Sequence, residues 1–199
     1  MGMNFLAHLL LSGESRAVQA GNLFGDEIKG RNYTYLPEDV AKGVTLHRFI
    51  DSHADTSELN LNLKLVLYPH FHKYAGVALD IYFDHFLSRH WTNFSETSLE
   101  LFADGVYKEL KPFVHLFSSK SEVIFSSMIK HKWLAGYGNL HGMNMTFRGM
   151  RKILPNNAGM ENAVQVLEQH YELIENGFIE YFPILFADSQ QKLLDLFEC

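Results

Sequence analysis

Apolar residues recur at intervals of three and four along most of the chain, and the strict alternation that is typical of strands is scarce. Because this spacing is the helical period, it predicts an all-α protein. Pro37, followed by acidic residues, predicts the start of a helix, and Gly30 predicts the end of the helix before it. Pro183 lies inside the last helical segment, where its missing backbone donor predicts a kink or break near Phe182. The expected helices span residues 3–12, 14–29, 37–53, 56–67, 70–92, 96–110, 119–131, 139–154 and 158–195.

Length and composition favour one domain that spans residues 1–199. Of the 199 residues, 47% are hydrophobic and 20% are charged, which supplies a core and is unlike a disordered chain. The net charge of −6 argues against nucleic acid as a partner. The one cysteine, Cys199, gives neither an intrachain disulfide nor a thiolate cluster. Since no apolar stretch reaches the ~20 residues of a spanning helix, we expect a cytoplasmic protein without a membrane partner.

Acidic and histidine side chains stand inside segments that are otherwise apolar. His47 and Asp51 are four residues apart and share one face of a helix. Asp84 and His85 lie in a segment so apolar that it must be largely buried, and Asp26 ends the motif Gly-Asn-Leu-Phe-Gly-Asp. A buried carboxylate is costly unless it is paired or binds a metal. Each pair alone is more typical of a hydrogen-bonded pair or a helix cap, but the combination across three segments predicts a metal centre.

Other residues near these clusters add to the picture or limit it. The candidate ligands are carboxylates and imidazoles without thiolate, which suits Mn, Mg, Fe or Zn and favours Mn or Mg. Arg48 and Arg89 suit contacts with phosphate, and they equally suit salt bridges to neighbouring acids. His8 is either a hydrogen-bonded core histidine or a site residue. Because nucleotide-binding glycine motifs and a G-x-S-x-G elbow are absent, we expect neither a nucleotide cofactor nor a serine hydrolase.

Four motifs within residues 3–91 resemble, in order and spacing, those of the acyl carrier protein phosphodiesterases. They are Asn4-Phe-Leu-Ala-His8, Gly21-Asn-Leu-Phe-Gly-Asp26, Leu46-His-Arg-Phe-Ile-Asp51 and Leu79-Asp-Ile-Tyr-Phe-Asp-His-Phe-Leu-Ser-Arg-His-Trp91. That family is regarded as a divergent branch of the HD-type metal phosphohydrolases, so the resemblance implies a helical HD-like domain. It also implies that the chain removes the 4'-phosphopantetheine arm from holo acyl carrier protein by phosphodiester hydrolysis with Mn²⁺ or Mg²⁺.

The resemblance implies the metal ligands, and the reaction that it implies gives a hypothesis for the roles of other residues. Arg48 and Arg89 would neutralise charge on the phosphoryl oxygens, and His8 or Asp80 would protonate the serine oxygen that leaves. The metal ligands would be drawn from Asp26, His47, Asp51, Asp84 and His85.

The resemblance also bears on the partner. Acyl carrier proteins are acidic, so docking would need a local basic patch. The candidates for it are Lys64, Lys73, Arg89, Lys130, Lys132, Arg148, Arg151 and Lys152. Two alternatives stay open. An HD-like phosphohydrolase acting on a small nucleotide would share the metal site, whereas a non-catalytic helical module that binds a carrier protein would need no metal. Bound metal and metal-dependent activity distinguish these classes.

Overall fold

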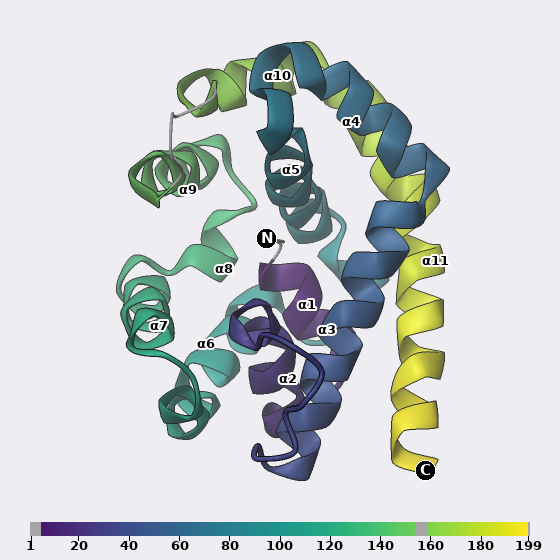
Figure 1. Ribbon diagram of the computed structural model, residues 1–199. Coiled ribbons are helices and arrows are strands. Elements are labelled where there is room, and N and C mark those ends of the chain that lie inside the picture. The colour runs from purple at the N-terminus through teal and green to yellow at the C-terminus, as the bar shows by residue number, and fades with distance from the viewer. Residues whose placement is uncertain (1–4, 154–158, 199) are drawn as a thin grey trace.

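Helices are the only regular secondary structure in residues 5–153 and 159–198, which are the residues that the structure describes (Figure 1). The structure is a computed structural model, and for residues 150–153 it describes the backbone alone. It confirms the all-α prediction. Within these ranges no helix is both long and apolar enough to cross a membrane.

The elements follow one another along the chain, with short 3₁₀ helices (η) between several of the α-helices. They are α1 (Phe5–Leu11), α2 (Arg16–Leu23), η1 (Gly25–Glu27), α3 (Glu38–Thr56), α4 (Glu58–Phe71), η2 (His72–Tyr74), α5 (Ala75–Arg89), η3 (Trp91–Asn93), α6 (Leu99–Glu109), η4 (Lys111–Leu116), α7 (Ser119–His131), α8 (Trp133–Gly136), α9 (Leu140–Ile153), η5 (Met160–Asn162), α10 (Ala163–Gln169) and α11 (Tyr171–Glu198).

The short helix α1 lies in the middle of the molecule, with α2 and α5 packed against it (Figure 1). Apart from Phe5, all its side chains are buried. Its first turn is held by Asp84 of α5, whose two carboxylate oxygens accept hydrogen bonds from the backbone N–H groups of Leu6 and Ala7, at 2.9 Å each. These donors have no partner inside their own helix, and a carboxylate at a helix N-terminus is favourable. Asp84 therefore anchors the helix that carries His8.

Helices α2 and α3 pack at very close range because glycines face each other across them. A Cβ atom at Gly21 would lie 2.0 Å from the carbonyl oxygen of Val40, and one at Gly43 would lie 2.2 Å from that of Val18. No larger residue fits at either position without moving the helices apart. This approach brings the backbone of Asn22 on α2 within hydrogen-bond distance of a side chain on α3.

Four of the expected helices differ clearly from the observed ones, since the helix expected over 56–67 extends to Phe71 as α4. The helix expected over 14–29 ends at Leu23, and η1 follows, so Asp26 lies on a 3₁₀ turn. The helix expected over 70–92 begins at Ala75, because α4 continues through Pro69 and His72 turns the chain with a φ of 48°. The helix expected over 158–195 is divided into η5, α10 and α11.

Of the kink or break predicted near Phe182, the break is wrong, because α11 continues through Pro183; the kink stays a prediction. Proline at this position removes the donor that would bond the carbonyl oxygen of Ile179. Pro183 is exposed and Ile179 is 50% exposed, so this face of the helix is open to water. Water can therefore donate to the carbonyl oxygen of Ile179 in place of the missing N–H group. On the opposite face, the buried side chains of Phe178, Phe182 and Leu185 hold both halves of the helix on the core.

Candidate metal centre

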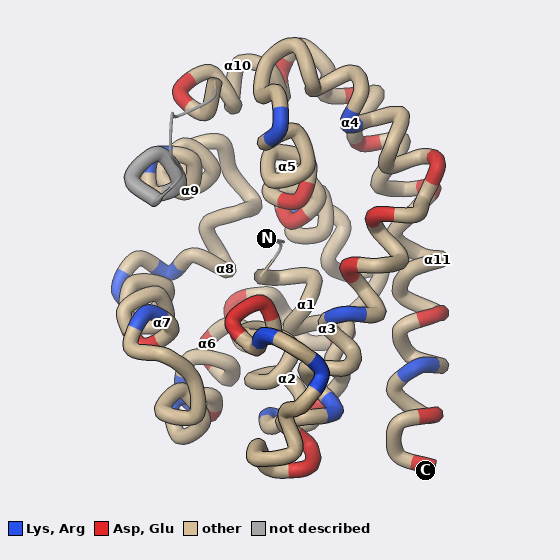
Figure 2. Tube along the Cα trace, in the orientation of Figure 1, with Lys and Arg blue, Asp and Glu red and all other residues tan. Residues whose placement is uncertain are grey.

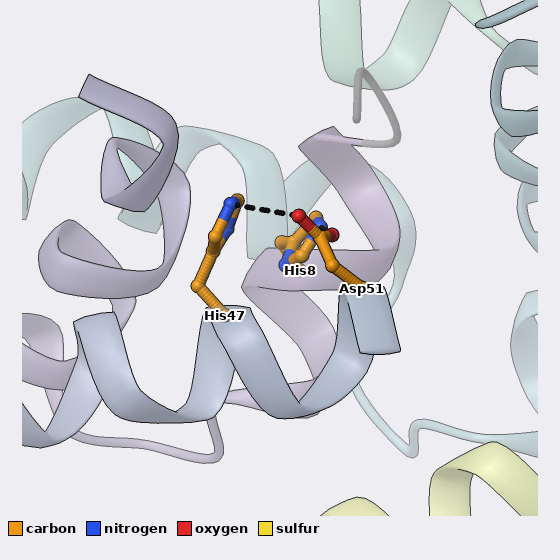
Figure 3. Close-up of side chains that lie close together, drawn as sticks. All are labelled: His8, His47 and Asp51. Carbon is orange, nitrogen blue, oxygen red and sulfur yellow. Dashed lines mark ion pairs between the residues drawn. The ribbon is translucent and has the colours of Figure 1, made fainter. Parts of the chain in front are cut away.

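His8, His47 and Asp51 point toward one another in the interior of the protein (Figure 3). Nε2 of His47 lies 3.2 Å from Oδ2 of Asp51, and Nε2 of His8 lies 3.4 Å from Oδ1 of the same carboxylate. The two imidazole rings stack with their centroids 4.5 Å apart. Asp26 places Oδ1 3.6 Å from Nε2 of His47. Residues from α1, η1 and α3 thus form one cluster of imidazoles and carboxylates.

Asn22 fixes the orientation of both imidazole rings. Its side-chain Oδ1 accepts a hydrogen bond from Nδ1 of His8 at 2.6 Å, and its backbone carbonyl accepts one from Nδ1 of His47 at 2.7 Å. Its Nδ2 donates to the His8 carbonyl and to the Ser12 hydroxyl, which sets the orientation of the amide. Because an acceptor faces each Nδ1, the proton of each neutral ring resides there and the lone pair is on Nε2.

The two Nε2 atoms are buried, and neither makes a hydrogen bond within the protein. The carboxylate oxygens of Asp51 and Asp26 are close to them but poorly aligned for hydrogen bonding. A buried polar atom without a hydrogen-bond partner lowers the stability of the fold by about 1–3 kcal/mol. Ligand atoms about 2.1 Å from a shared ion lie about 3.0–3.4 Å apart, and the Asp51 oxygens lie 3.2 and 3.4 Å from the two Nε2 atoms. The donor set therefore fits a divalent ion, with imidazoles that suit transition ions and carboxylates that suit Mn²⁺ and Mg²⁺.

Without an ion, the nearby carboxylates favour a second proton on His47, so that this imidazole is charged. Burial by itself lowers the pKa of His47, but the carboxylates of Asp26 and Asp51 outweigh burial and raise this pKa to about 9. Burial lowers the pKa of His8, and the charge of His47 lowers it further. Burial opposes ionisation of Asp51, but the two histidines outweigh it and hold the pKa of Asp51 well below its usual range. At neutral pH one imidazole is charged, the other is neutral, and the carboxylates are ionised.

Asp84 and His85, also expected as metal ligands, do not belong to this cluster. Both oxygens of Asp84 are bonded to the first turn of α1. His85 donates from Nδ1 to the carbonyl oxygen of Tyr137 at 2.7 Å, and its Nε2 lies 3.2 Å from the Tyr171 hydroxyl. Both residues are buried, as expected, but protein groups satisfy their polar atoms. This geometry gives no support to a ligand role for either residue.

Neither of the two arginines expected to contact phosphate lines the cavity beside Asp51. Arg48 donates to the carbonyl oxygens of Ile28 and Gly30, at 2.9 and 2.7 Å, and its guanidinium lies over the ring of Tyr33. It therefore holds the loop that follows Asp26. Arg89 is exposed in the last turn of α5.

A cavity of about 190 Å³ adjoins the cluster, with Asp51 in its wall. Asp80, another residue predicted from the sequence, lines the same cavity as Asp51. Lys64 and Lys73 line it as well, and Lys64 pairs with Asp55 at 2.8 Å. The sequence offered these two lysines only as candidates for docking the carrier protein and not for contact with phosphate, because no spacing along the chain connects them with the cluster.

Sequence reasoning also missed Asn22 and Gly25, although both lie in the motif that ends at Asp26. A Cβ atom at Gly25 would come within 2.5 Å of the His47 ring, so only glycine lets η1 approach this ring. The sequence did contain a signal for them, because an asparagine stands between two glycines in an apolar segment, a few residues before the candidate ligand Asp26.

The fold and the cluster together define an all-helical protein with a candidate centre of two histidines and two carboxylates. The chain matches the acyl carrier protein phosphodiesterase family over residues 3–185 and belongs to that family. Proteins named acyl carrier protein phosphodiesterase are similar to it along nearly their whole length. That of Yersinia pestis is 26% identical over 191 residues, which cover 96% of this chain and 99% of the relative.

Two further relatives give the same picture. That of Salmonella paratyphi A is 28% identical over 193 residues, covering 96% and 100% of the two chains. That of Photorhabdus laumondii is 28% identical over 191 residues, covering 96% of each. No solved structure matches the chain.

Proposed function

We propose that this chain hydrolyses the phosphodiester that joins the 4'-phosphopantetheine arm to a serine of holo acyl carrier protein, with Mn²⁺ or Mg²⁺ as cofactor. Residues 1–199 act as one catalytic domain. The observation that carries the proposal is the pair of buried Nε2 atoms, on His8 and His47, which face the Asp51 carboxylate and lack hydrogen bonds. Family membership supports the carrier protein as substrate over a small nucleotide.

The residues of the cluster have separate tasks. His8, His47 and Asp51 would hold the ion, with Asp26 as a fourth group next to His47. Asn22 keeps a proton on each Nδ1, so that the lone pair of each Nε2 atom would face the ion. When bound, the ion supplies positive charge that polarises the phosphate and lowers the pKa of the attacking water.

The cavity beside Asp51 supplies the groups for the rest of the reaction. Lys73 lines it and would contact the phosphodiester oxygens. Asp80 lines it too and remains our candidate for donating a proton to the serine oxygen as the bond to phosphorus breaks. The products are the apo carrier protein, with a free serine hydroxyl, and 4'-phosphopantetheine, which takes up the oxygen of water. Arg48 acts indirectly, since it holds the loop after Asp26.

The test is incubation of the purified chain with holo acyl carrier protein and Mn²⁺, followed by intact mass measurement of the carrier protein. We expect the mass to fall by that of the arm, and a chelator to stop the reaction. His47→Ala should abolish it. His53→Ala is the matched control, because His53 bonds Tyr181 and Asp188 outside the cluster, and it should retain activity. Unchanged mass with every divalent ion tried, from a folded sample, would contradict the proposal.

A further inference from the structure

A groove of about 1240 Å³ opens between α7, α8 and α9, on the side of the molecule away from α11 (Figure 1). It is separate from the cavity beside Asp51, with which it shares no lining residue. Neither the cluster nor the proposed chemistry uses it.

The lining of the groove combines cations with exposed apolar side chains. Lys132 and Arg148 are both exposed on it. Val123 and Met145 are 70% and 47% exposed, although an aqueous surface gives them no favourable contact. None of the described residues that line it is acidic, whereas the chain as a whole carries a net charge of −6. Figure 2 shows Lys and Arg, in blue, along α7 and at its junction with α8.

Two contacts connect the walls of the groove with the elements that carry the candidate metal centre. The ring of Trp133, in the lining, stacks on that of Phe5 in α1, with centroids 6.2 Å apart. At the start of α7, the Ser118 hydroxyl donates to the Glu27 carboxylate at 2.7 Å, and Glu27 is next to Asp26. A molecule bound in the groove would therefore lie beside the elements that hold His8 and Asp26.

We propose that this groove docks an acidic, amphipathic helix of the carrier protein from which the arm is removed. This inference rests on the proposed function. A protein substrate needs a surface beside the site, and a positively charged, partly apolar groove complements a helix with acidic and apolar faces. A helix with side chains is about 10–12 Å across and rises 5.4 Å per turn, so the groove has room for roughly two to three turns.

Charge reversal in the groove tests the proposal. Arg148→Glu and Lys132→Glu should each raise KM for holo acyl carrier protein about tenfold, because like charges would then face the partner. Turnover of bis(4-nitrophenyl) phosphate, which has no protein part, should be unchanged. Lys192→Glu on α11 makes the same change in net charge away from the groove and should leave both substrates unaffected. Thermal melting confirms that each variant is folded.

Direct titration separates this inference from the proposed function. Holo acyl carrier protein is titrated into chelator-treated wild-type and variant protein, so that binding is measured without hydrolysis. Weaker binding by the groove variants supports the docking site even if no arm is released. Unchanged KM and unchanged binding in both folded variants would overturn it. So would sedimentation showing that the variants convert a wild-type dimer into monomers while KM stays the same, since the groove would then hold a second copy of this chain.

Discussion

The side-chain oxygen of Asn22 lies 2.6 Å from Nδ1 of His8, and this contact joins the first two helices at the candidate metal centre. The backbone carbonyl of the same residue accepts from Nδ1 of His47. One residue of α2 thus sets the ring orientation of a histidine on α1 and of another on α3. Its position depends on the close approach of α2 and α3 at Gly21 and Gly43.

Replacing Asn22 with alanine should weaken metal binding without removing a ligand. The His8 ring would lose its acceptor, and loss of such an outer-shell partner costs about 10–100-fold in metal affinity. Titration of Mn²⁺ into the chelator-treated variant measures this change. Asn60→Ala is the control, since Asn60 is an equally buried asparagine that bonds the Ala54 carbonyl outside the cluster. If both variants bind Mn²⁺ as the wild type does, Asn22 does not orient the ligands.

The sequence predicted the part of the site that lies within one helix. His47 and Asp51 share a face because of the helical repeat, and the structure brings them within 3.2 Å. His8 could be assigned neither to the core nor to the site, because its place beside Asp51 depends on α2, which packs against both α1 and α3. Asp84 was correctly expected to be buried, but its partner lies 78 residues away along the chain, and no local pattern shows that a carboxylate caps a distant helix.

Binding of an ion should stabilise the folded chain. A ligand that binds only the folded state, at about 100 times its dissociation constant, adds about 2.7 kcal/mol. For a chain of this size that corresponds to a rise in Tm of roughly 5–10 °C. Differential scanning fluorimetry with and without Mn²⁺ measures the shift. His47→Ala should lose the shift and His53→Ala should keep it, whereas an equal shift in both variants would place the ion elsewhere.

Asp84→Ala should destabilise the fold while the stoichiometry of Mn²⁺ binding stays the same. The substitution leaves the N–H groups of Leu6 and Ala7 without their acceptor, at about 1–3 kcal/mol for each buried donor. Tm should therefore fall clearly. Asp39→Ala, at an exposed acid in the first turn of α3, should change Tm little. A variant that keeps the wild-type Tm but no longer binds Mn²⁺ would instead identify Asp84 as a ligand.

Metal binding should release a proton at neutral pH. The pKa of His47 is raised to about 9, so this imidazole is charged in the ion-free protein at pH 7.5 and must lose its proton to bind an ion. The pKa of His8 is lowered, so His8 contributes no proton. Calorimetry at pH 7.5 in buffers of different ionisation enthalpy should show about one proton released per Mn²⁺, falling toward zero above the pKa of His47.

The stability of the ion-free protein should fall as the pH rises. Because the folded-state pKa of His47 is raised above its usual value of 6.5, the stability it contributes is fully present below pH 6.5. This stability is lost as the pH rises through about 9. Denaturant unfolding of chelator-treated protein at pH 6.5 and pH 9.5 measures the difference. Binding without proton release, together with no loss of stability over this range, would mean that His47 is neutral in the ion-free cluster.

Gly25→Ala should impair the metal centre although it changes no polar group. The new methyl would come within 2.5 Å of the His47 ring, so either the ring or η1, which carries Asp26, must move. Overpacking of this kind costs about 1–3 kcal/mol, and we expect weaker Mn²⁺ binding together with a lower Tm. Gly149→Ala is the matched control, because a Cβ atom there meets nothing within 4 Å and the residue lies inside α9. That substitution should raise stability by about 0.5–1 kcal/mol and leave Mn²⁺ affinity unchanged. Wild-type Mn²⁺ affinity in Gly25→Ala would show that the ligand geometry does not depend on the approach of η1 to His47.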